Sequence, residues 1–408
     1  MTVHDRSGGA GTGLEEEPPT RFRADPEWAR RSARALRSFV PDPDPTPEEF
    51  AAVARGLTRS DEAGAALAVA IGEREVTLAQ FREALAHGVP HDAPEPLRAF
   101  FAVVEDRPGW VDEARLRRGA RVMRRAGTNM VDVLNGSLLS GYRSSADTAA
   151  LVMTGALSGA PTRRLGETMK WAVECVREDG MARWGEGWRL TVHVRLMHAL
   201  VNRRLVRRAD WDVRERGLPI NQADQGATLG LHCTYYLLGI RMLGFPVGKA
   251  DADAVMHLWR YVGWLMGVAD EWLPLSEAHG RRIFYRLSLA APPPDEHSRA
   301  LAAAFEESRR HLTFKRFEGP RRAYELAKSR SLARVLVGGE GMRELGLRAA
   351  PPWYHLLRIP ANLVKHGLLR HLPGGERWLT ARGERELDRT LPRHFANTPA
   401  TIGPHPTP

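Results

Sequence analysis

The stretch GWRLTVHVRLMHALVNRRL, residues 187–205, predicts a long helix with one inward face. Apolar residues recur in it every three or four positions, which is the spacing of a helix that buries one side. The side chains that share this face are Thr191, Val194, Arg195, His198, Val201, Asn202 and Leu205. The helix therefore sets a single imidazole, with an arginine one turn before it, on a mostly apolar surface.

Two later segments, residues 227–240 and 254–267, are apolar on nearly every side. Helices of this kind lie at the centre of a protein. Glycines interrupt the two segments at Gly230, Gly239, Gly263 and Gly267. Each glycine costs about 1 kcal/mol relative to alanine. A close-packed helix or a flat ligand against the backbone would explain that cost, and close helix packing is the commoner cause.

Helical spacing extends over most of the chain. Cap residues, prolines and acids mark helix starts at Pro26, Thr46-Pro47 and Asp251. Further helices are expected near residues 77–87, 93–104, 111–125, 127–141, 145–157, 161–178, 187–207, 225–243, 253–267, 275–289, 297–312, 319–336 and 353–371. Because alternating patterns of any length are missing, we expect an all-α protein.

The chain is long enough for one large domain with a sizeable core. Of its 408 residues, 43% are hydrophobic and 11 are tryptophan, which suffices to bury a cofactor or an apolar ligand. We expect a single helical domain over residues 25–394, with a disordered segment at 1–24 and a flexible tail at 395–408.

A net charge of +10 raises the question of a nucleic-acid partner. Most of the basic residues are arginines, and acids are interleaved with them, as in residues 113–118 and 382–389. This pattern favours a solvated, ion-paired surface over a specific nucleic-acid face. The two cysteines, Cys175 and Cys233, are too few for a disulfide framework or a zinc site and are expected to be buried.

We expect neither an export signal nor a membrane span. Residues 1–25 lack the apolar stretch of a signal peptide, and the most apolar window, residues 229–243, is short and contains polar residues. The sequence therefore predicts a soluble, cytoplasmic monomer. A start codon further upstream that encodes a signal peptide would make the protein secreted.

His198 has two interpretations, an iron ligand or a core histidine. Axial ligation of haem requires a neutral imidazole in an apolar slot, with a cation such as Arg195 near enough to offset the propionates. His193 points about 140° away from His198 and cannot join it on one metal. His232 and His257, on the two apolar helices, are expected to be core histidines.

A second group of polar side chains lies in residues 162–171. Arg164 and Thr168 share a helix face, with Glu167 beside them, so a cation, a hydroxyl and an acid would line one wall of a cavity. Such groups hydrogen-bond dioxygen and stabilise developing negative charge. The alternative is a surface network in which Glu167 pairs with Arg163.

The segment GLPINQADQGAT, residues 217–228, leads into the first apolar helix. Asn221 or Asp224 would cap that helix, and Thr228 is expected to face a pocket. The sequence contains no Walker loop, dinucleotide-binding GxGxxG motif, GxSxG elbow or Cys-Pro haem-thiolate signature. Nucleotide-binding, hydrolase and P450-like functions are therefore not expected.

The motifs VRLMHALVNRRL (194–205), GLPINQADQGAT (217–228) and GWLMGVADEWLP (263–274) resemble those of the bacterial latex-clearing proteins, or rubber oxygenases. The wider family, DUF2236, includes the fungal oxygenase of the mycophenolic-acid pathway. The resemblance extends over about residues 95–345. It implies an all-helical fold with a globin-like core, one b-type haem with its iron, and oxygenase chemistry.

The resemblance also implies roles for individual residues. His198 falls on the proximal haem ligand, and Arg164 and Thr168 fall on the distal arginine and threonine. The chain departs from the family in two places. Glu167 stands where those enzymes have a lysine able to close over the iron, and only Asp147 lies near the position of their distal glutamate. Glu167 would then take the acid–base role.

Together these inferences predict a haem b dioxygenase. It would use O2 to cleave carbon–carbon double bonds in an apolar, isoprenoid-like substrate such as a polyisoprene or a terpenoid. Two alternatives stay open: a haem-binding protein without oxygenase activity, and a basic helical interaction protein without a cofactor. The residues predicted to act on the substrate are Arg164, Glu167 and Thr168, and those predicted to hold the cofactor are His198, Arg195 and Thr228.

Overall fold

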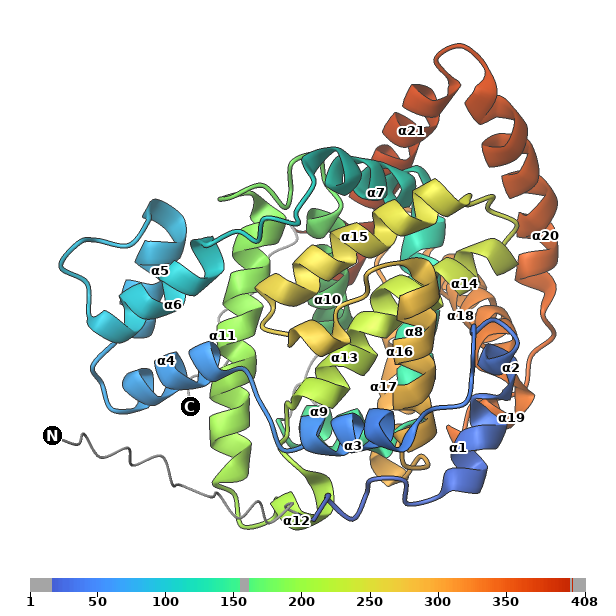
Figure 1. Ribbon diagram of the computed structural model, residues 1–408. Coiled ribbons are helices and arrows are strands. Elements are labelled where there is room, and N and C mark those ends of the chain that lie inside the picture. The colour runs from blue at the N-terminus through green and yellow to red at the C-terminus, as the bar shows by residue number, and fades with distance from the viewer. Residues whose placement is uncertain (1–16, 155–160, 397, 399–408) are drawn as a thin grey trace, which may run out of the picture.

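The computed structural model describes residues 17–154, 161–396 and 398. Every regular element in these ranges is a helix, and the helices assemble into one large all-helical body (Figure 1). The predicted fold class is therefore confirmed.

The helices follow one another along the whole described chain. In the first half they are α1 (Pro26–Ser32), α2 (Arg34–Arg37), α3 (Pro47–Gly56), α4 (Glu62–Gly72), α5 (Leu78–His87), α6 (Glu95–Glu105), α7 (Glu113–Arg125), α8 (Thr128–Gly141), α9 (Ser145–Met153), α10 (Pro161–Cys175) and α11 (Glu186–Val206). In the second half they are α12 (Val213–Arg216), α13 (Gln222–Gly230), η1 (Leu231–Tyr235), α14 (Tyr236–Met242), α15 (Lys249–Leu265), η2 (Asp270–Trp272), α16 (Glu277–Ala290), α17 (Glu296–Arg310), α18 (Glu318–Leu336), α19 (Gly338–Glu344), α20 (Trp353–Asn362), η3 (Leu363–Leu368), η4 (Leu369–His371), α21 (Gly375–Thr390) and η5 (Leu391–Phe395).

The helix starts follow from local capping. Asp25 caps α1 through the amide of Trp28, and Thr46 and Glu49 form a reciprocal capping box at α3. The starts predicted at Pro26 and Thr46 are therefore confirmed. α15 begins earlier than predicted, at Lys249, so that Asp251 lies within its first turn.

The two segments predicted to be central are buried. α15 has buried side chains around most of its circumference, and α7 packs across it so closely that a Cβ on Gly119 would lie 2.3 Å from the carbonyl oxygen of Ala254. Gly230 and Gly263 allow similar contacts, since a Cβ there would lie 2.3 Å from Phe284 and 2.6 Å from Leu229. Of the two explanations for these glycines, close helix packing is the one observed.

The helix predicted over residues 225–243 is divided by a π-helical turn, Leu231–Tyr235. Two side chains in this turn bond to carbonyl groups four residues back: His232 Nδ1 lies 2.8 Å from the Thr228 oxygen, and Cys233 Sγ lies 3.2 Å from the Leu229 oxygen. Such bonds compete with the amides for the same carbonyls and widen the helix.

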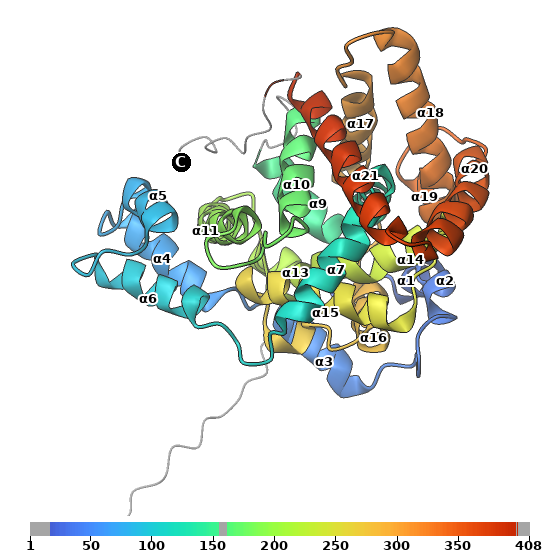
Figure 2. The ribbon, with the colours of Figure 1, turned by 90° about the horizontal axis from the view of Figure 1, so that it is seen from above.

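Among the longer helices, α4 and α21 lie outside the predicted ranges, as do the short helices α12 and α19. α4 is rich in alanine and glycine and shows no clear apolar stripe, whereas α21 is strongly polar overall but buries Leu379, Gly383 and Leu387 at four-residue spacing. Figure 2 shows α4, α5 and α6 as a separate group on the outer side of α11, with α17, α18 and α21 at the opposite side of the molecule.

Residues 17–24, at the end of the segment predicted to be disordered, pack against the body. Arg21 forms an ion pair with Asp224 at 2.6 Å, and the Thr20 amide donates to the Arg214 carbonyl. Cys175 and Cys233 are buried, as predicted. Among the described helices, none combines the length and the apolar character that crossing a bilayer requires.

Candidate functional site

Helices α10 and α11 touch at one point and then diverge. Trp171 Nε1 donates to Thr191 Oγ1 at 3.0 Å, and a Cβ on Gly187 would lie 2.8 Å from the backbone of Cys175. Figure 2 looks down α11 and shows α10 running across the view. Arg164 and His198 each lie seven residues beyond the Trp171–Thr191 bond, so each is about two helical turns from it along its own helix.

The face of α11 that the sequence predicted to be inward is only partly covered. Thr191, Arg195, Asn202 and Leu205 are buried, whereas Val194, His198 and Val201 are half-exposed. On α10, Thr168 and Trp171 are half-exposed as well. We refer to these side chains of α10 and α11, together with Arg164 and Glu167, as the wedge.

Arg195 is held by a partner that the sequence did not reveal. Its guanidinium forms two hydrogen bonds with the Asp61 carboxylate, both 2.7 Å long, and a third with the Leu265 carbonyl at 3.3 Å. The pair is shielded from solvent, with side-chain exposures of 5% for Arg195 and 13% for Asp61. Asp61 precedes α4, so this ion pair fastens α11 to the N-terminal helices.

His198 and Arg195 line the same small pocket. Its other walls include Asp61, Asn202 and Gln225. The structure therefore brings together the predicted iron ligand and the predicted cation, and it adds the carboxylate that neutralises this cation.

Thr228 lies one turn after Gln225 on α13 and is exposed, although its neighbour Leu229 is buried. Its carbonyl oxygen bonds to His232 Nδ1. Thr228 is not among the side chains that line the pocket of His198, so its orientation toward a pocket stays a prediction.

His232 lies in an aromatic cage below the point where α10 and α11 meet. Its ring centroid is 5.3 Å from that of Trp171 and 5.0 Å from that of Trp259. The side chain is buried, and burial lowers the pKa of this imidazole, so His232 is neutral. His257 lies elsewhere, against Trp110, so the two core histidines do not approach each other.

The three predicted residues of α10 form a connected group. Glu167 pairs with Arg164 at 3.2 Å and with Arg163 at 3.3 Å, so the ion pair of the alternative interpretation is present. Thr168 Oγ1 donates to the Arg164 carbonyl at 3.4 Å. The side chain of Asp147 lies outside the described part of the chain.

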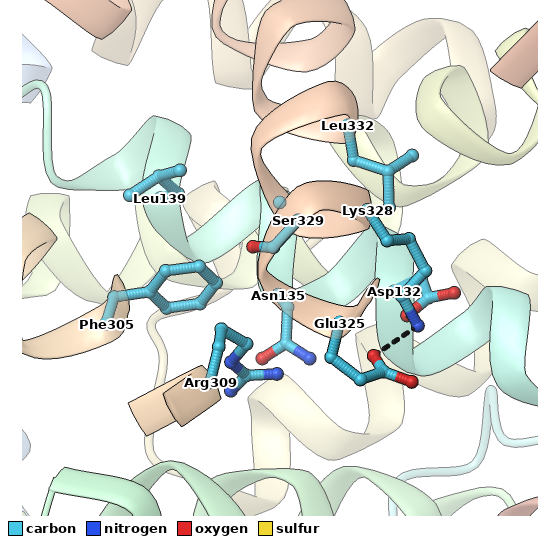
Figure 3. Close-up of a pocket in the computed structure, with 10 residues that line it drawn as sticks. Asp132, Asn135, Leu139, Phe305, Arg309, Glu325, Lys328, Ser329 and Leu332 are labelled. Carbon is cyan, nitrogen blue, oxygen red and sulfur yellow. Dashed lines mark ion pairs between the residues drawn. The ribbon is translucent and has the colours of Figure 1, made fainter. Parts of the chain in front are cut away.

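A second small cavity lies among α8, α17 and α18 (Figure 3). Lys328 Nζ pairs with Asp132 at 2.9 Å and with Glu325 at 2.6 Å, and Arg309 adds a second buried cation. Burial lowers the pKa of Arg309. The cavity holds two acids and two bases, and none of the predicted site residues lines it.

Comparison with known proteins supports the predicted relationship. Residues 124–365 match the family described as "ER-bound oxygenase mpaB/B'/Rubber oxygenase, catalytic domain". The rubber oxygenase of Streptomyces sp. (strain K30) is 30% identical over 198 residues, which are 47% of this chain and 47% of that protein. The chain thus matches about half the length of this curated relative.

A solved structure has the same fold. The latex clearing protein LCP in the closed state superposes with a TM-score of 0.65 over 82% of this chain and 91% of that chain, at 22% identity. The family match covers more than half of the chain and includes α8, α10, α11, α13 and α15. The chain therefore belongs to the family of the mpaB-type and rubber oxygenase catalytic domains.

Proposed function

We propose that this protein is a haem b oxygenase in which His198 is the axial ligand of the iron. The observation that carries the proposal is the wedge. It sets an imidazole on α11 and a guanidinium, a carboxylate and a hydroxyl on α10, on two helices that diverge from a common contact. An imidazole that would hold the iron, with polar groups on a neighbouring helix, is the set of side chains that such a cofactor would use.

The residues of the wedge fit a porphyrin. Val194, Val201 and Trp171 are half-exposed apolar side chains on inward faces, which a flat apolar ring would cover. Thr228 would border the ring from α13. Arg195 lines the pocket of His198 and would lie near a propionate, although Asp61 already neutralises much of its charge.

Bound haem would supply the iron at which dioxygen is activated. Around it, Arg164 would donate hydrogen bonds from its guanidinium, and the Thr168 hydroxyl would orient the reacting groups. Glu167, whose Oε2 lies 3.2 Å from Arg164 Nη1, would accept and return a proton. The apolar side chains of the wedge would exclude water and bind the substrate.

The proposed reaction is the addition of both atoms of O2 across a carbon–carbon double bond of an isoprenoid-like substrate. The carbon–carbon bond breaks, and each carbon leaves as a carbonyl group. Apolar walls with few polar groups suit such a substrate, because an alkene offers no hydrogen-bonding partner.

The absorption spectrum of the purified protein tests the cofactor. A Soret band is expected, and the His198→Ala variant is expected to lose most of its bound haem. His193→Ala is the matched control, because His193 lies on the same helix against Phe81 and points away from the wedge. Full haem occupancy in the His198 variant would show that His198 is not the iron ligand.

Oxygen uptake tests the reaction. Addition of squalene or a short polyisoprene to the reduced protein is expected to consume O2 and yield aldehyde and ketone fragments. A haem-loaded protein that consumes no O2 with any alkene would favour the binding protein without oxygenase activity. A colourless preparation that binds nucleic acid in a strongly salt-dependent way would favour the interaction protein.

A further inference from the structure

A row of large apolar side chains lies open to solvent on α20, η3 and the segment that follows them. The row consists of Leu356, Leu357, Leu363, Val364, Leu368 and Leu372, which are between 49% and 67% exposed. Their exposure places them on the outer surface of the segment. Single exposed leucines are common on protein surfaces, but a continuous row marks an interaction site. We call this row the apolar ridge.

The opposite face of the same segment is polar and docked on the protein. Tyr354 OH donates to Asp132 at 3.1 Å, and Asn362 Nδ2 donates to the Leu243 carbonyl at 2.8 Å. His366 packs against Phe245 with ring centroids 4.0 Å apart. An ordinary surface helix turns its apolar face inward. Here the polarity is inverted, so the protein's own core does not account for the apolar ridge.

Basic side chains accompany the apolar ridge. Residues 353–378 contain Arg358, Lys365, Arg370 and Arg377 and a single acid, Glu376. Glu376 is paired with Arg125 at 3.1 Å. Arg377 is exposed and has no ion pair within the described part of the chain. Arg370 pairs with Asp251 at 3.4 Å, and Arg358 donates to Asn129 on the docked face. Within the described part of the chain, the positive charge beside the ridge that has no ion pair therefore comes from Lys365 and Arg377, in a chain with a net charge of +10.

The hairpin formed by α20 and α21 also projects from the molecule. In Figure 1 it rises above the rest of the body, with its connecting loop at the top. Trp378, near the start of α21, is 49% exposed. An indole ring beside apolar and basic side chains is typical of groups that lie at the boundary between water and lipid.

We propose that the apolar ridge inserts into one leaflet of an anionic lipid bilayer and holds the protein on the membrane surface. The leucines would enter the boundary between headgroups and acyl chains, and the basic side chains would contact lipid phosphates. A second copy of the chain fits the ridge less well, because two positive surfaces would face each other. The proposal depends on neither haem nor the oxygenase reaction.

Co-sedimentation of the full-length protein with lipid vesicles tests the proposal. Binding is expected to vesicles of phosphatidylcholine mixed with phosphatidylglycerol, to be weaker without phosphatidylglycerol, and to fall as salt is added. The triple variant Leu357→Ser, Leu363→Ser, Leu368→Ser is expected to bind at least about tenfold more weakly, because three apolar side chains no longer enter the lipid. Leu275→Ser is the control, since Leu275 is 59% exposed outside the ridge.

Circular dichroism and thermal unfolding would show that the triple variant is folded, and the corresponding triple glutamate variant provides a second test of the same ridge. Equal vesicle binding by wild type and the triple variant would overturn the proposal, as would no binding by wild type. Sedimentation velocity tests whether a second copy of the chain covers the ridge instead. A lipid-free dimer that the triple variant dissociates, without vesicle binding, would assign the ridge to a second copy and contradict the proposal.

Discussion

Arg195 and Asp61 form a buried ion pair beside the predicted iron ligand. Removing one partner of such a pair leaves a charge without compensation in a poorly solvated place, which costs more than the pair itself contributes. We therefore expect Asp61→Ala to lower the free energy of unfolding by about 3 kcal/mol or more. Denaturant unfolding of the purified variant measures this loss.

The exposed pair Arg37–Asp44 provides the control for that prediction. Its atoms are 3.2 Å apart, but the side chains are 51% and 76% exposed. Asp44→Ala is expected to change stability by less than about 1 kcal/mol, because water and salt screen the pair. Equal losses of unfolding free energy in the two variants would show that burial does not determine the contribution of the Asp61–Arg195 pair.

The lowered pKa of His257 predicts that this residue makes the stability of the protein sensitive to acid. Burial is the main cause that lowers its pKa from 6.5 to about 4, and the nearby Arg115 lowers it further. Between about pH 6.5 and 4, His257 binds a proton in the unfolded chain but not in the folded chain. Its contribution to the free energy of unfolding is therefore fully present above about pH 6.5 and declines as the pH falls toward 4. His257→Gln is expected to reduce the slope by one proton, about 1.4 kcal/mol per pH unit. An unchanged slope in unfolding curves across this range would contradict the assignment.

Single residues differ in how far the sequence predicts their surroundings. The inward face of His198 follows from helical spacing alone, because its neighbours on that face are three or four positions away. Asp61 could not be assigned to Arg195 in the same way, since 134 positions separate them and any buried acid would satisfy the arginine. Glu167 lies between these cases, because both of its possible partners are on its own helix.

At the scale of helices, the crossing of α7 and α15 depends on Gly119. A Cβ there would lie 2.3 Å from the backbone oxygen of Ala254, so the two helices would have to separate. We expect Gly119→Ala to destabilise the protein by about 2 kcal/mol or more. Gly319→Ala is the control, because a Cβ at Gly319 would meet nothing within 4 Å. A shift in melting temperature no larger than that of the control would contradict this packing argument.

Caps or apolar spacing made some helices predictable, and their absence hid α4. α3 has a capping box, and α11 has a continuous apolar spacing. The faces of α4 differ little in polarity, so apolar spacing does not predict this helix. The π-helical turn at Leu231–Tyr235 depends on two side-chain bonds to the backbone, which hydrophobic spacing does not report.

Over the whole molecule, the ion pairs test the interpretation that the basic residues form a solvated, ion-paired surface. Arg117 and Arg118, in one of the two segments cited from the sequence, pair with Asp179 and Asp251, and Arg382, in the other, pairs with Glu386. These pairs agree with the expected ion-paired surface. The excess of basic residues around the apolar ridge was not predictable from composition, because it depends on which side of α20 faces the protein.

The family match covers residues 124–365, but residues outside this range contact the matched helices. A fragment limited to these residues lacks Asp61 and most of α7, which packs along α15. It is expected to unfold without a sharp thermal transition, because Arg195 and one side of α15 would lose their partners. A fragment of residues 17–396 retains both and is expected to melt like the full chain. A cooperative transition in the shorter fragment would show that the N-terminal helices are dispensable.

The π-helical turn also has a consequence for the evolution of this protein's sequence. A π turn holds one residue more than an α turn, so deleting a single codon within residues 231–235 would restore regular α-helix. The flanking helices would keep their orientation, while His232 would leave its cage between Trp171 and Trp259. An alignment of homologues should therefore show one-residue gaps at this place. Lineages with and without the gap would differ in the side chain that lies below the wedge.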